Sequence, residues 1–227
     1  MNKVDELLNT DHVKFLFSIF EINNADIRLV GGCIRDSLIN KELKDIDSAT
    51  TLEPNEVINL LQNNNIEYDD FAIQYGSIIS YPLNQKIQIT TLREDINQIG
   101  RHTNVIYTTN WEKDAARRDF TFNAMYLGSN NKLFDYYNGT DDLKEKKIRF
   151  IGEIEERIKE DYLRIYRYFR FLGLFKLPNI TLKDQKIVEK YIHESLSILT
   201  NDMIRHEVLK MFNMPYREIE MLIASQI

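Results

Sequence analysis

Cysteine, glycine, proline and long apolar runs are all scarce in this chain of 227 residues. The single cysteine, Cys33, excludes an internal disulfide framework and any zinc site built on several cysteines. Eight glycines and four prolines are too few for long flexible linkers or proline-rich disorder. No apolar run approaches the roughly 20 residues of a transmembrane helix, and residues 1–11 lack the pattern of a signal peptide. We therefore expect a cytoplasmic protein without membrane contact.

The charge balance of the chain is acidic. Against 35 Asp and Glu there are 29 Lys and Arg, which gives a net charge of −6. Such a chain does not bind nucleic acid by bulk attraction, so any contact of that kind must come from local basic groups. The length allows one large domain or two small ones with a substantial core.

The apolar pattern changes once along the chain, near residues 140–148. Before this point, strand-like runs at 26–30 and 45–49 and a β-hairpin over 71–91, with its turn at 82–85, alternate with helical patterns. These helical patterns cover 6–20, with a break near Thr10, then 33–40, and 54–62, where Pro54 marks the start. From Leu143 onward, helical periodicity continues to the end. We predict an α+β protein, with a mixed β-sheet and flanking helices over 1–142 and an all-helical domain over 143–227.

The first motif with chemical content is LVGGCIRD at residues 29–36, followed by Asp45-Ile46-Asp47. Gly31 and Gly32 directly after a strand let the backbone approach a phosphate at the start of a helix. On a strand, Asp45 and Asp47 project from the same face, with Ile46 toward the core. Paired carboxylates beside substrate phosphates are what Mg²⁺ requires. The alternative is a solvated strand end with a glycine turn, which the added Arg35-Asp36 disfavours.

The second motif is DAARRDFTFNA at residues 114–124. Arginine side chains bind phosphate in bidentate fashion, so Arg117 and Arg118 are candidates for a triphosphate. Asp119 is placed to orient one of these arginines or to bind a ribose hydroxyl. The alternative is a structural ion-pair cluster at the start of a helix.

The third motif is EDYLRIYRYFRF at residues 160–171. On one helix, Glu160, Arg164 and Arg167 share a face, and Asp161 lies beside Arg164. An aspartate and an arginine held side by side offer acceptors and donors for the Watson–Crick edge of a base. The alternative is a surface helix laced with ion pairs.

These three motifs, in this order, resemble the class II tRNA nucleotidyltransferase (CCA-adding enzyme) and bacterial poly(A) polymerase family. The resemblance extends from about Arg28 to Met211. It implies a catalytic nucleotidyltransferase head followed by a helical neck that selects the nucleotide base. It also implies that an RNA 3′-hydroxyl, most simply that of tRNA, attacks the α-phosphate of CTP or ATP and that pyrophosphate leaves, without a template.

The resemblance assigns a role to each site residue. Metal binding and catalysis, with Mg²⁺ as the cofactor, fall to Asp45 and Asp47. Contacts to the triphosphate and ribose fall to Gly31, Gly32, Arg35, Asp36, Asp114, Arg117, Arg118, Asp119 and Asn123. Selection of the incoming base falls to Asp161 and Arg164, with support from Arg167.

The chain departs from the family at one residue and in length. Gln88 stands where the family usually has a glutamate in the strand before T-T-x-R, and a neutral side chain there would weaken metal binding. By alternation along the strand, Gln88 shares a face with Thr90 and is placed to point toward the metal site. The body and tail domains that grip tRNA in the family are absent from this sequence. We therefore expect a partner chain or a homodimer to supply that grip.

Three hypotheses stay open from the sequence. The first is an active RNA nucleotidyltransferase that adds C, A or both. The second is a degenerate nucleotide-binding module without turnover, which Gln88 and the short length favour. The third is one half of a split CCA-adding enzyme.

Overall fold

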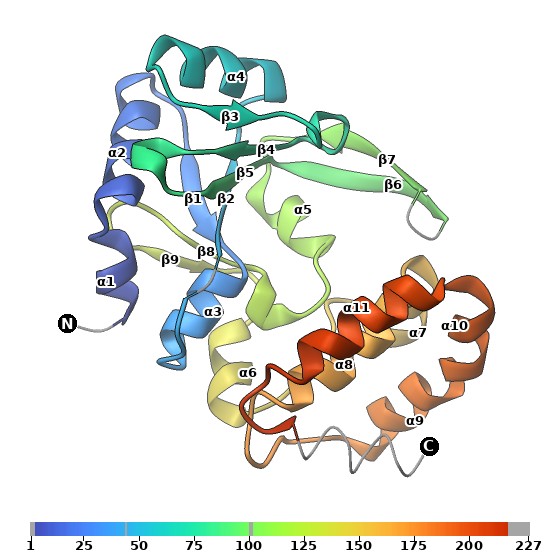
Figure 1. Cartoon of the computed structure of the whole chain (residues 1–227). Coiled ribbons are helices and arrows are strands. Elements are labelled where there is room, and N and C mark those ends of the chain that lie inside the picture. The colour runs from blue at the N-terminus through green and yellow to red at the C-terminus, as the bar shows by residue number, and fades with distance from the viewer. Residues whose placement is uncertain (1–2, 44, 100–101, 218–227) are drawn as a thin grey trace. The chain divides into compact units, whose positions relative to one another are not determined.

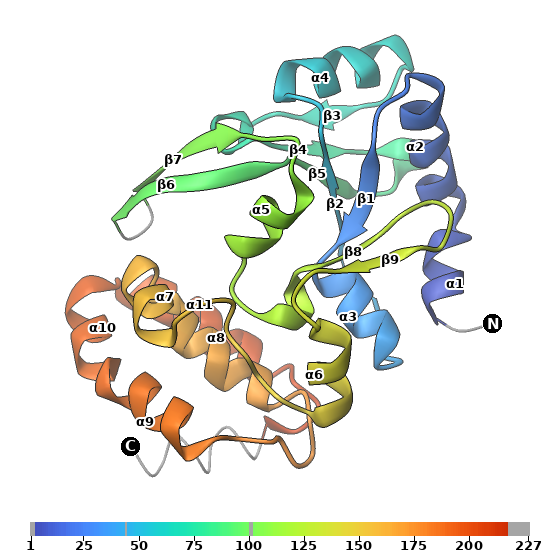
Figure 2. The same ribbon diagram turned by 180° about the vertical axis from the view of Figure 1, so that it is seen from behind.

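The protein is described by a computed structural model that covers residues 3–43, 45–99 and 102–217. The chain divides into two compact units, whose elements Figures 1 and 2 show from opposite sides. Unit 1 comprises Met1–Ile96, Val105–Arg118 and Phe122–Gly139. Unit 2 comprises Asn97–Asn104, Asp119–Thr121 and Thr140–Ile227. The assignment of a catalytic role to the first part and a base-selecting role to the second stays a prediction.

Unit 1 is built on a seven-stranded sheet with the order β3-β4-β5-β2-β1-β8-β9. Its strands are β1 (Ile27–Val30), β2 (Ile46–Thr50), β3 (Tyr68–Asp69), β4 (Ser77–Ser80), β5 (Ile87–Thr91), β8 (Met125–Leu127) and β9 (Leu133–Asp135). All neighbours are antiparallel except β2 and β5, which are parallel. The mixed sheet predicted from the sequence is therefore confirmed.

Helices flank this sheet, as predicted. They are α1 (Lys3–Leu8), α2 (Asp11–Ile22), α3 (Gly32–Leu38), α4 (Pro54–Asn63) and α5 (Trp111–Ala116). Helices α1 and α2 lie together along one side of unit 1 in both views, and α1 also contacts α3 (Figures 1 and 2). The expected break near Thr10 is the N-cap of α2, and Pro54 opens α4, where its missing N–H costs nothing.

The predicted hairpin over 71–91 is confirmed as β4 and β5 in antiparallel register. Along β5, Ile87, Ile89 and Thr91 are buried, whereas Gln88 and Thr90 are half-buried. This alternation follows from the two-residue period of a strand.

Short 3₁₀ turns lie at Ile73–Tyr75, Pro82–Asn84 and Thr121–Asn123. The turn at Pro82–Asn84 joins the two strands, with Leu83 in the left-handed region at φ 52°.

A second, two-stranded sheet consists of β6 (Arg93–Ile99) and β7 (His102–Tyr107). The sequence did not predict this pair. The first strand reads REDINQI, and Asp, Asn and Glu are depleted in strands, so composition gave no β signal there.

Unit 2 is formed mainly by helices, which confirms the prediction over residues 143–217, while residues 218–227 lie outside the described part of the chain. They are α6 (Gly139–Glu145), α7 (Ile154–Glu160), α8 (Leu163–Leu172), α9 (Leu182–Lys190), α10 (Ile192–Ile198) and α11 (Asn201–Met211). Helix α8 packs against α11. Aromatic rings join the segment around Phe120 to the helices: its ring centroid lies 4.7 Å from that of Phe150 and 5.3 Å from that of Phe171.

Within the described residues, every helix is either too short or too polar to cross a membrane.

Candidate active site

The glycine turn and the paired aspartates meet at one edge of the unit 1 sheet. Strands β1 and β2 run antiparallel with Leu29 opposite Ser48, so the end of β1 lies beside the start of β2. Gly31 follows β1 directly, and Asp47 is the second residue of β2. Two motifs that are separate in the sequence are thus brought together by the strand register.

Asp45 and Asp47 differ in their surroundings. Strand β2 begins at Ile46, one residue later than predicted, so Asp45 is an exposed residue just before the strand. Ile46 is half-buried and does not enter the core. Burial raises the pKa of the Asp47 carboxyl, and the charge of Asp45 raises it further, while Arg118 opposes the shift. A cation would relieve this concentration of negative charge.

Gly31 has a backbone conformation that only glycine adopts readily. Its φ is 78° and its ψ is −126°, just before α3. A Cβ atom at this position would lie 3.6 Å from the Asn123 carbonyl oxygen and 3.8 Å from Arg118 Nη1. The second motif therefore lies directly against the glycine turn.

Arg35 links the same two motifs through its side chain. It is 9% exposed, donates from Nη1 to Asn123 Oδ1 at 2.7 Å, and forms an ion pair from Nε to Asp36 Oδ1 at 2.9 Å. The predicted residues Arg35, Asp36 and Asn123 thus form one connected group, whose hydrogen bonds fix the side chains beside the glycine turn.

Asp114 is the anchor of the second motif. Its side chain is fully buried and lies 2.8 Å from Arg117 Nε and 2.9 Å from Arg118 Nη2. Tyr126 donates its hydroxyl to Asp114 Oδ2 at 2.7 Å. Burial would raise the pKa of Asp114, but Arg118 and Arg117 lower it well below its usual range, so the carboxylate is charged at neutral pH.

The two arginines follow the end of α5, whereas the sequence placed the ion-pair cluster at a helix start. Asn110 caps the N-terminus by accepting from the backbone N–H groups of Glu112 and Lys113. Arg117 is the C-cap residue, and Asp114 reaches it and Arg118 at helical spacings of three and four residues. The ion-pair cluster and the candidate phosphate-binding arginines are therefore the same structure.

Asp119 belongs to unit 2, whereas Arg117 and Arg118 belong to unit 1, so an orienting role of Asp119 toward either arginine stays a prediction. Its Oδ2 atom lies 2.6 Å from Arg167 Nη2, and its Oδ1 atom accepts from the Phe120 backbone N–H at 2.8 Å. The carboxylate of the second motif is thus joined to an arginine of the third.

The third motif spans two helices and the bend between them, not the single helix that the spacing predicted. Glu160 ends α7, Asp161 is its C-cap residue, and α8 begins at Leu163. Asp161 Oδ1 accepts from the Leu163 backbone N–H at 3.0 Å. Glu160 Oε2 forms an ion pair with Arg164 Nη1 at 2.6 Å across the bend, so the shared face of Glu160 and Arg164 is retained.

Gln88 lies beside Asp47. Strands β2 and β5 pair in parallel with Asp47 opposite Gln88, which places both side chains on one face of the sheet. Gln88 Nε2 donates to Ser77 Oγ at 2.8 Å, which fixes the amide. The departure at position 88 thus falls next to the candidate metal ligand, as the alternation in the sequence predicted.

The residues at this edge fit a magnesium ion in their chemistry. Asp45 and Asp47 supply hard carboxylate oxygens, and burial is the main cause that raises the pKa of Asp47. Mg²⁺ is commonly bound by one or two carboxylates together with substrate phosphates. Among the residues that the structure describes, no group of three or more His, Cys, Asp or Glu forms another metal cluster.

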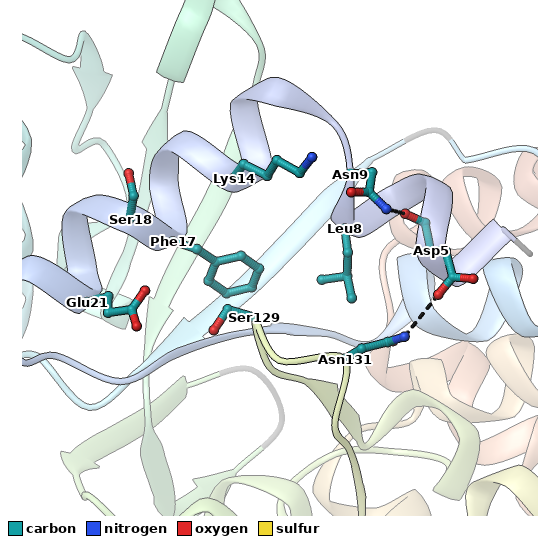
Figure 3. A pocket seen from close by; sticks show the side chains of 9 residues that line it. All are labelled: Asp5, Leu8, Asn9, Lys14, Phe17, Ser18, Glu21, Ser129 and Asn131. Carbon is teal, nitrogen blue, oxygen red and sulfur yellow. Dashed lines mark hydrogen bonds between the residues drawn. The ribbon is translucent and has the colours of Figure 1, made fainter. Parts of the chain in front are cut away.

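A pocket of about 280 Å³ lies elsewhere in unit 1, between α1, α2 and the turn after β8 (Figure 3). Asn131 donates to Asp5 Oδ1 at 2.9 Å across its rim, and Phe17 forms part of its floor. None of the predicted site residues lines this pocket. It is therefore separate from the candidate active site.

Sequence reasoning missed the partners that orient the predicted residues. Tyr126 binds Asp114, Ser77 binds Gln88, and Arg157 forms an ion pair with Glu160. Only Arg157 carried a signal, because it precedes Glu160 by three residues on a predicted helix. The other two contacts join separate strands and depend on the sheet register.

Comparison with known proteins gives one matching family model, the poly A polymerase head domain, over residues 27–149. The human protein "CCA tRNA nucleotidyltransferase 1, mitochondrial" is 45% identical over 167 residues, covering 73% of this chain and 38% of that protein. A "CCA-adding enzyme" of Oceanobacillus iheyensis is 37% identical over 195 residues, covering 84% of this chain and 46% of that protein. The chain thus spans less than half the length of these relatives.

Solved structures share the fold. The crystal structure of the Bacillus stearothermophilus CCA-adding enzyme in complex with CTP has a TM-score of 0.84 at 22% identity, over 100% of this chain and 52% of that one. A tRNA nucleotidyltransferase complexed with a primer tRNA and an incoming ATP analog has a TM-score of 0.70 at 24% identity, over 90% of this chain and 61% of that one.

Replacing Gly31 should destabilise the protein because of its backbone conformation. We expect Gly31→Ala to lower the free energy of unfolding by about 1–3 kcal/mol, since φ 78° is unfavourable for an L-residue. Gly32→Ala is the matched control: its Cβ would make an ordinary 3.5 Å contact to Arg35 Nη2. Denaturant unfolding of both variants tests this, and equal effects would contradict it.

Replacing Asp114 should change both stability and its dependence on pH. We expect Asp114→Asn to lower the free energy of unfolding by about 3 kcal/mol at neutral pH, because it leaves two part-buried arginines without their shared counter-charge. The pKa of Asp114 is lowered in the folded state, so its contribution is present at neutral pH and is lost as pH falls below the ordinary carboxyl value of 3.8.

Urea unfolding between pH 7 and pH 3 measures this effect. The wild-type protein should lose more stability on acidification than Asp114→Asn does. Glu112→Gln removes the same charge from an exposed position of α5 and should follow the wild type. Parallel pH profiles for Asp114→Asn and the wild type would show that the carboxylate has no such role.

Proposed function

Because the chain belongs to the poly A polymerase head-domain family, we propose that it is an RNA nucleotidyltransferase that adds C, A or both to an RNA 3′ end without a template. The substrates are CTP, ATP and an RNA end, which we take to be that of tRNA because relatives carry that name. One observation carries the proposal: Asp47, at a strand end next to Asp45, lies in the field of Arg118, which a buried carboxylate fixes in place.

The proposed reaction is one displacement at phosphorus. The RNA 3′-hydroxyl oxygen attacks the α-phosphate, the bond between the α-phosphate and the bridging oxygen breaks, and the hydroxyl proton is lost as pyrophosphate leaves. Asp45 and Asp47 would hold Mg²⁺, which, when bound, stabilises charge on the attacking and leaving oxygens. Arg118 and Arg117 would bind the triphosphate beside the glycine turn, where Gly31 and Gly32 leave room for it.

The remaining residues divide into those that touch the nucleotide and those that position others. We assign Asp114 a positioning role, since it is fully buried and both arginines bind it. We assign Asp119 a positioning role toward Arg167, with which it forms an ion pair. Arg35, Asp36 and Asn123 would shape the wall of the triphosphate site.

Base selection is assigned to Asp161 and Arg164. Arg164 is 5% exposed and bound on one side by Glu160, so its guanidinium plane has a defined orientation. Side chains of this kind accept and donate hydrogen bonds in fixed directions, which a base edge can match without a template. We retain the proposals that further RNA contacts come from a partner chain or a homodimer and that the activity is cytoplasmic.

Incorporation of a labelled nucleotide tests the proposed function directly. We expect the chain with Mg²⁺ to extend tRNA lacking its 3′ CCA when CTP or ATP is supplied separately. Asp45→Ala with Asp47→Ala should reduce the rate at least about a hundredfold, because metal stabilisation of the transition state contributes several kcal/mol. Asp70→Ala removes an exposed carboxylate of unit 1 and should leave the rate unchanged. Extension that survives the double substitution would exclude the proposed site.

Gln88 favours a second candidate, a nucleotide-binding module with little or no turnover. A neutral side chain opposite Asp47 gives less charge to a metal than a carboxylate would. We follow the melting temperature as Mg²⁺ is added and expect Gln88→Glu to reach half of its total increase at a lower Mg²⁺ concentration than the wild type. Without metal, Gln88→Glu should be less stable than the wild type, because the new carboxylate repels Asp47. Gln62→Glu adds the same charge at an exposed position of α4 and is the control.

The rate of incorporation by Gln88→Glu separates the two candidates. A faster rate than that of the wild type identifies an enzyme weakened by Gln88. If the wild type and Gln88→Glu both bind nucleotides but incorporate none, the chain is a binding module. This conclusion also requires that adding a body-and-tail chain from a relative does not restore incorporation. An unchanged Mg²⁺ midpoint would show that position 88 does not act on the metal.

A further inference from the structure

Arg157 lies at the centre of an ion cluster in unit 2, and it is not among the residues to which the three motifs assign a role. Its Nη1 atom lies 2.5 Å from Glu160 Oε2, and Arg164 Nη1 lies 2.6 Å from the same oxygen atom. Two arginines therefore bind one carboxylate oxygen. The side chains of Arg157 and Arg164 are only 11% and 6% exposed, so water screens these contacts little.

Arg157 reaches Arg164 by a second route. Its backbone carbonyl oxygen accepts from Arg164 Nη1 at 2.7 Å. One nitrogen of Arg164 is thus bound both by the main chain of Arg157 and by the carboxylate that the Arg157 side chain holds. Because a guanidinium is planar and rigid, fixing one of its nitrogens from two directions restricts the orientation of the whole group.

The electrostatic cost of this arrangement argues against a purely stabilising role. Burial and the nearby charge of Arg164 lower the pKa of Arg157, while Glu160 and Asp119 only partly compensate. Three arginines, at 157, 164 and 167, share two carboxylates, Glu160 and Asp119, in the ion pairs of this cluster. Two guanidinium groups at one carboxylate oxygen repel each other, so this contact adds little to the stability of the fold, whereas it does restrict the geometry of Glu160 and Arg164.

We propose that Arg157 is a positioning residue for nucleotide selection, which acts through Glu160 to set the orientation of the Arg164 guanidinium. This inference rests on the proposed function and deepens it, because Arg164 is there assigned to the incoming base. Arg157 itself need not touch the nucleotide. Loss of its side chain would leave Glu160 with one arginine in place of two, so that Arg164 would keep the contact to the residue 157 carbonyl but lose the restraint on its carboxylate partner.

The experiment compares Arg157→Met, Arg157→Lys and a matched control, Arg170→Met, in the full chain. Arg170 also forms a buried ion pair from α8, with Glu207 at 2.7 Å, but does not bind Glu160 in any ion pair of the structure's described residues. The readouts are equilibrium binding of CTP, UTP, ATP and GTP, and single-nucleotide incorporation into tRNA lacking CCA. The measured quantity is the ratio of CTP to UTP and of ATP to GTP in each readout.

We expect Arg157→Met to lower these ratios about tenfold, through a rise in KM for CTP and ATP with a smaller change in kcat. Arg157→Lys should restore part of the loss, because an ammonium still binds Glu160 but without a planar fork. Arg170→Met should keep the wild-type ratios even where it lowers the melting temperature. A general loss of structure would lower both variants' stability without separating their nucleotide preferences.

The binding readout separates this inference from the proposed function. If the wild type binds CTP and ATP selectively but incorporates neither, the proposed turnover fails, and lost selectivity in Arg157→Met still supports the positioning role. If Arg157→Met keeps wild-type ratios, or if Arg170→Met loses them equally, the positioning role is wrong. Equal binding of all four nucleotides by the wild type would also overturn it.

Discussion

The buried carboxylate of Asp114 is the interaction on which the candidate site of unit 1 depends. An ionised carboxylate without exposure to water must be bound by positive groups and hydrogen-bond donors. Arg117, Arg118 and Tyr126 supply them, and the Arg93 backbone N–H adds a contact of 3.2 Å to Oδ1. Because the buried Asp114 carboxylate needs all of these partners, the end of α5, strand β8 and the start of β6 meet around it.

The effect of Asp114 extends to the sheet edge through Arg118. This arginine lies against the glycine turn and lowers the pKa of Asp47, which burial and Asp45 raise. Asp114, Arg118 and Asp47 thus interact in series, and the pKa of Asp114 is lowered whereas that of Asp47 is raised, mainly by burial. Local charge compensation, and not bulk charge, decides where a metal and a phosphate would bind.

The sequence predicted those features that depend on short spacings. Alternation along Ile87–Thr91 placed Gln88 on the same face of its strand as Thr90, and Pro54 marked a helix start. Residue spacing gave a wrong prediction for the third motif, where a single helix was expected. The Asp161 side chain accepts a hydrogen bond from the Leu163 backbone N–H, and this local contact divides the helix there. Residue spacing also failed for contacts between distant segments, such as Asp119 with Arg167, because periodicity carries no information about which segments pack together.

The acidic net charge takes a different meaning once the ion pairs are known. Asp114 binds two arginines, Glu160 binds two, and Asp119 binds one. These carboxylates are internal counter-ions, so they count toward the net charge of −6 but contribute little negative field at the surface. These three carboxylates form ion pairs with five arginines, so each group of ion pairs at Asp114 and Glu160 keeps a positive charge. A chain can therefore be acidic as a whole and still hold fixed positive groups, so net charge alone does not predict whether it binds an anionic ligand.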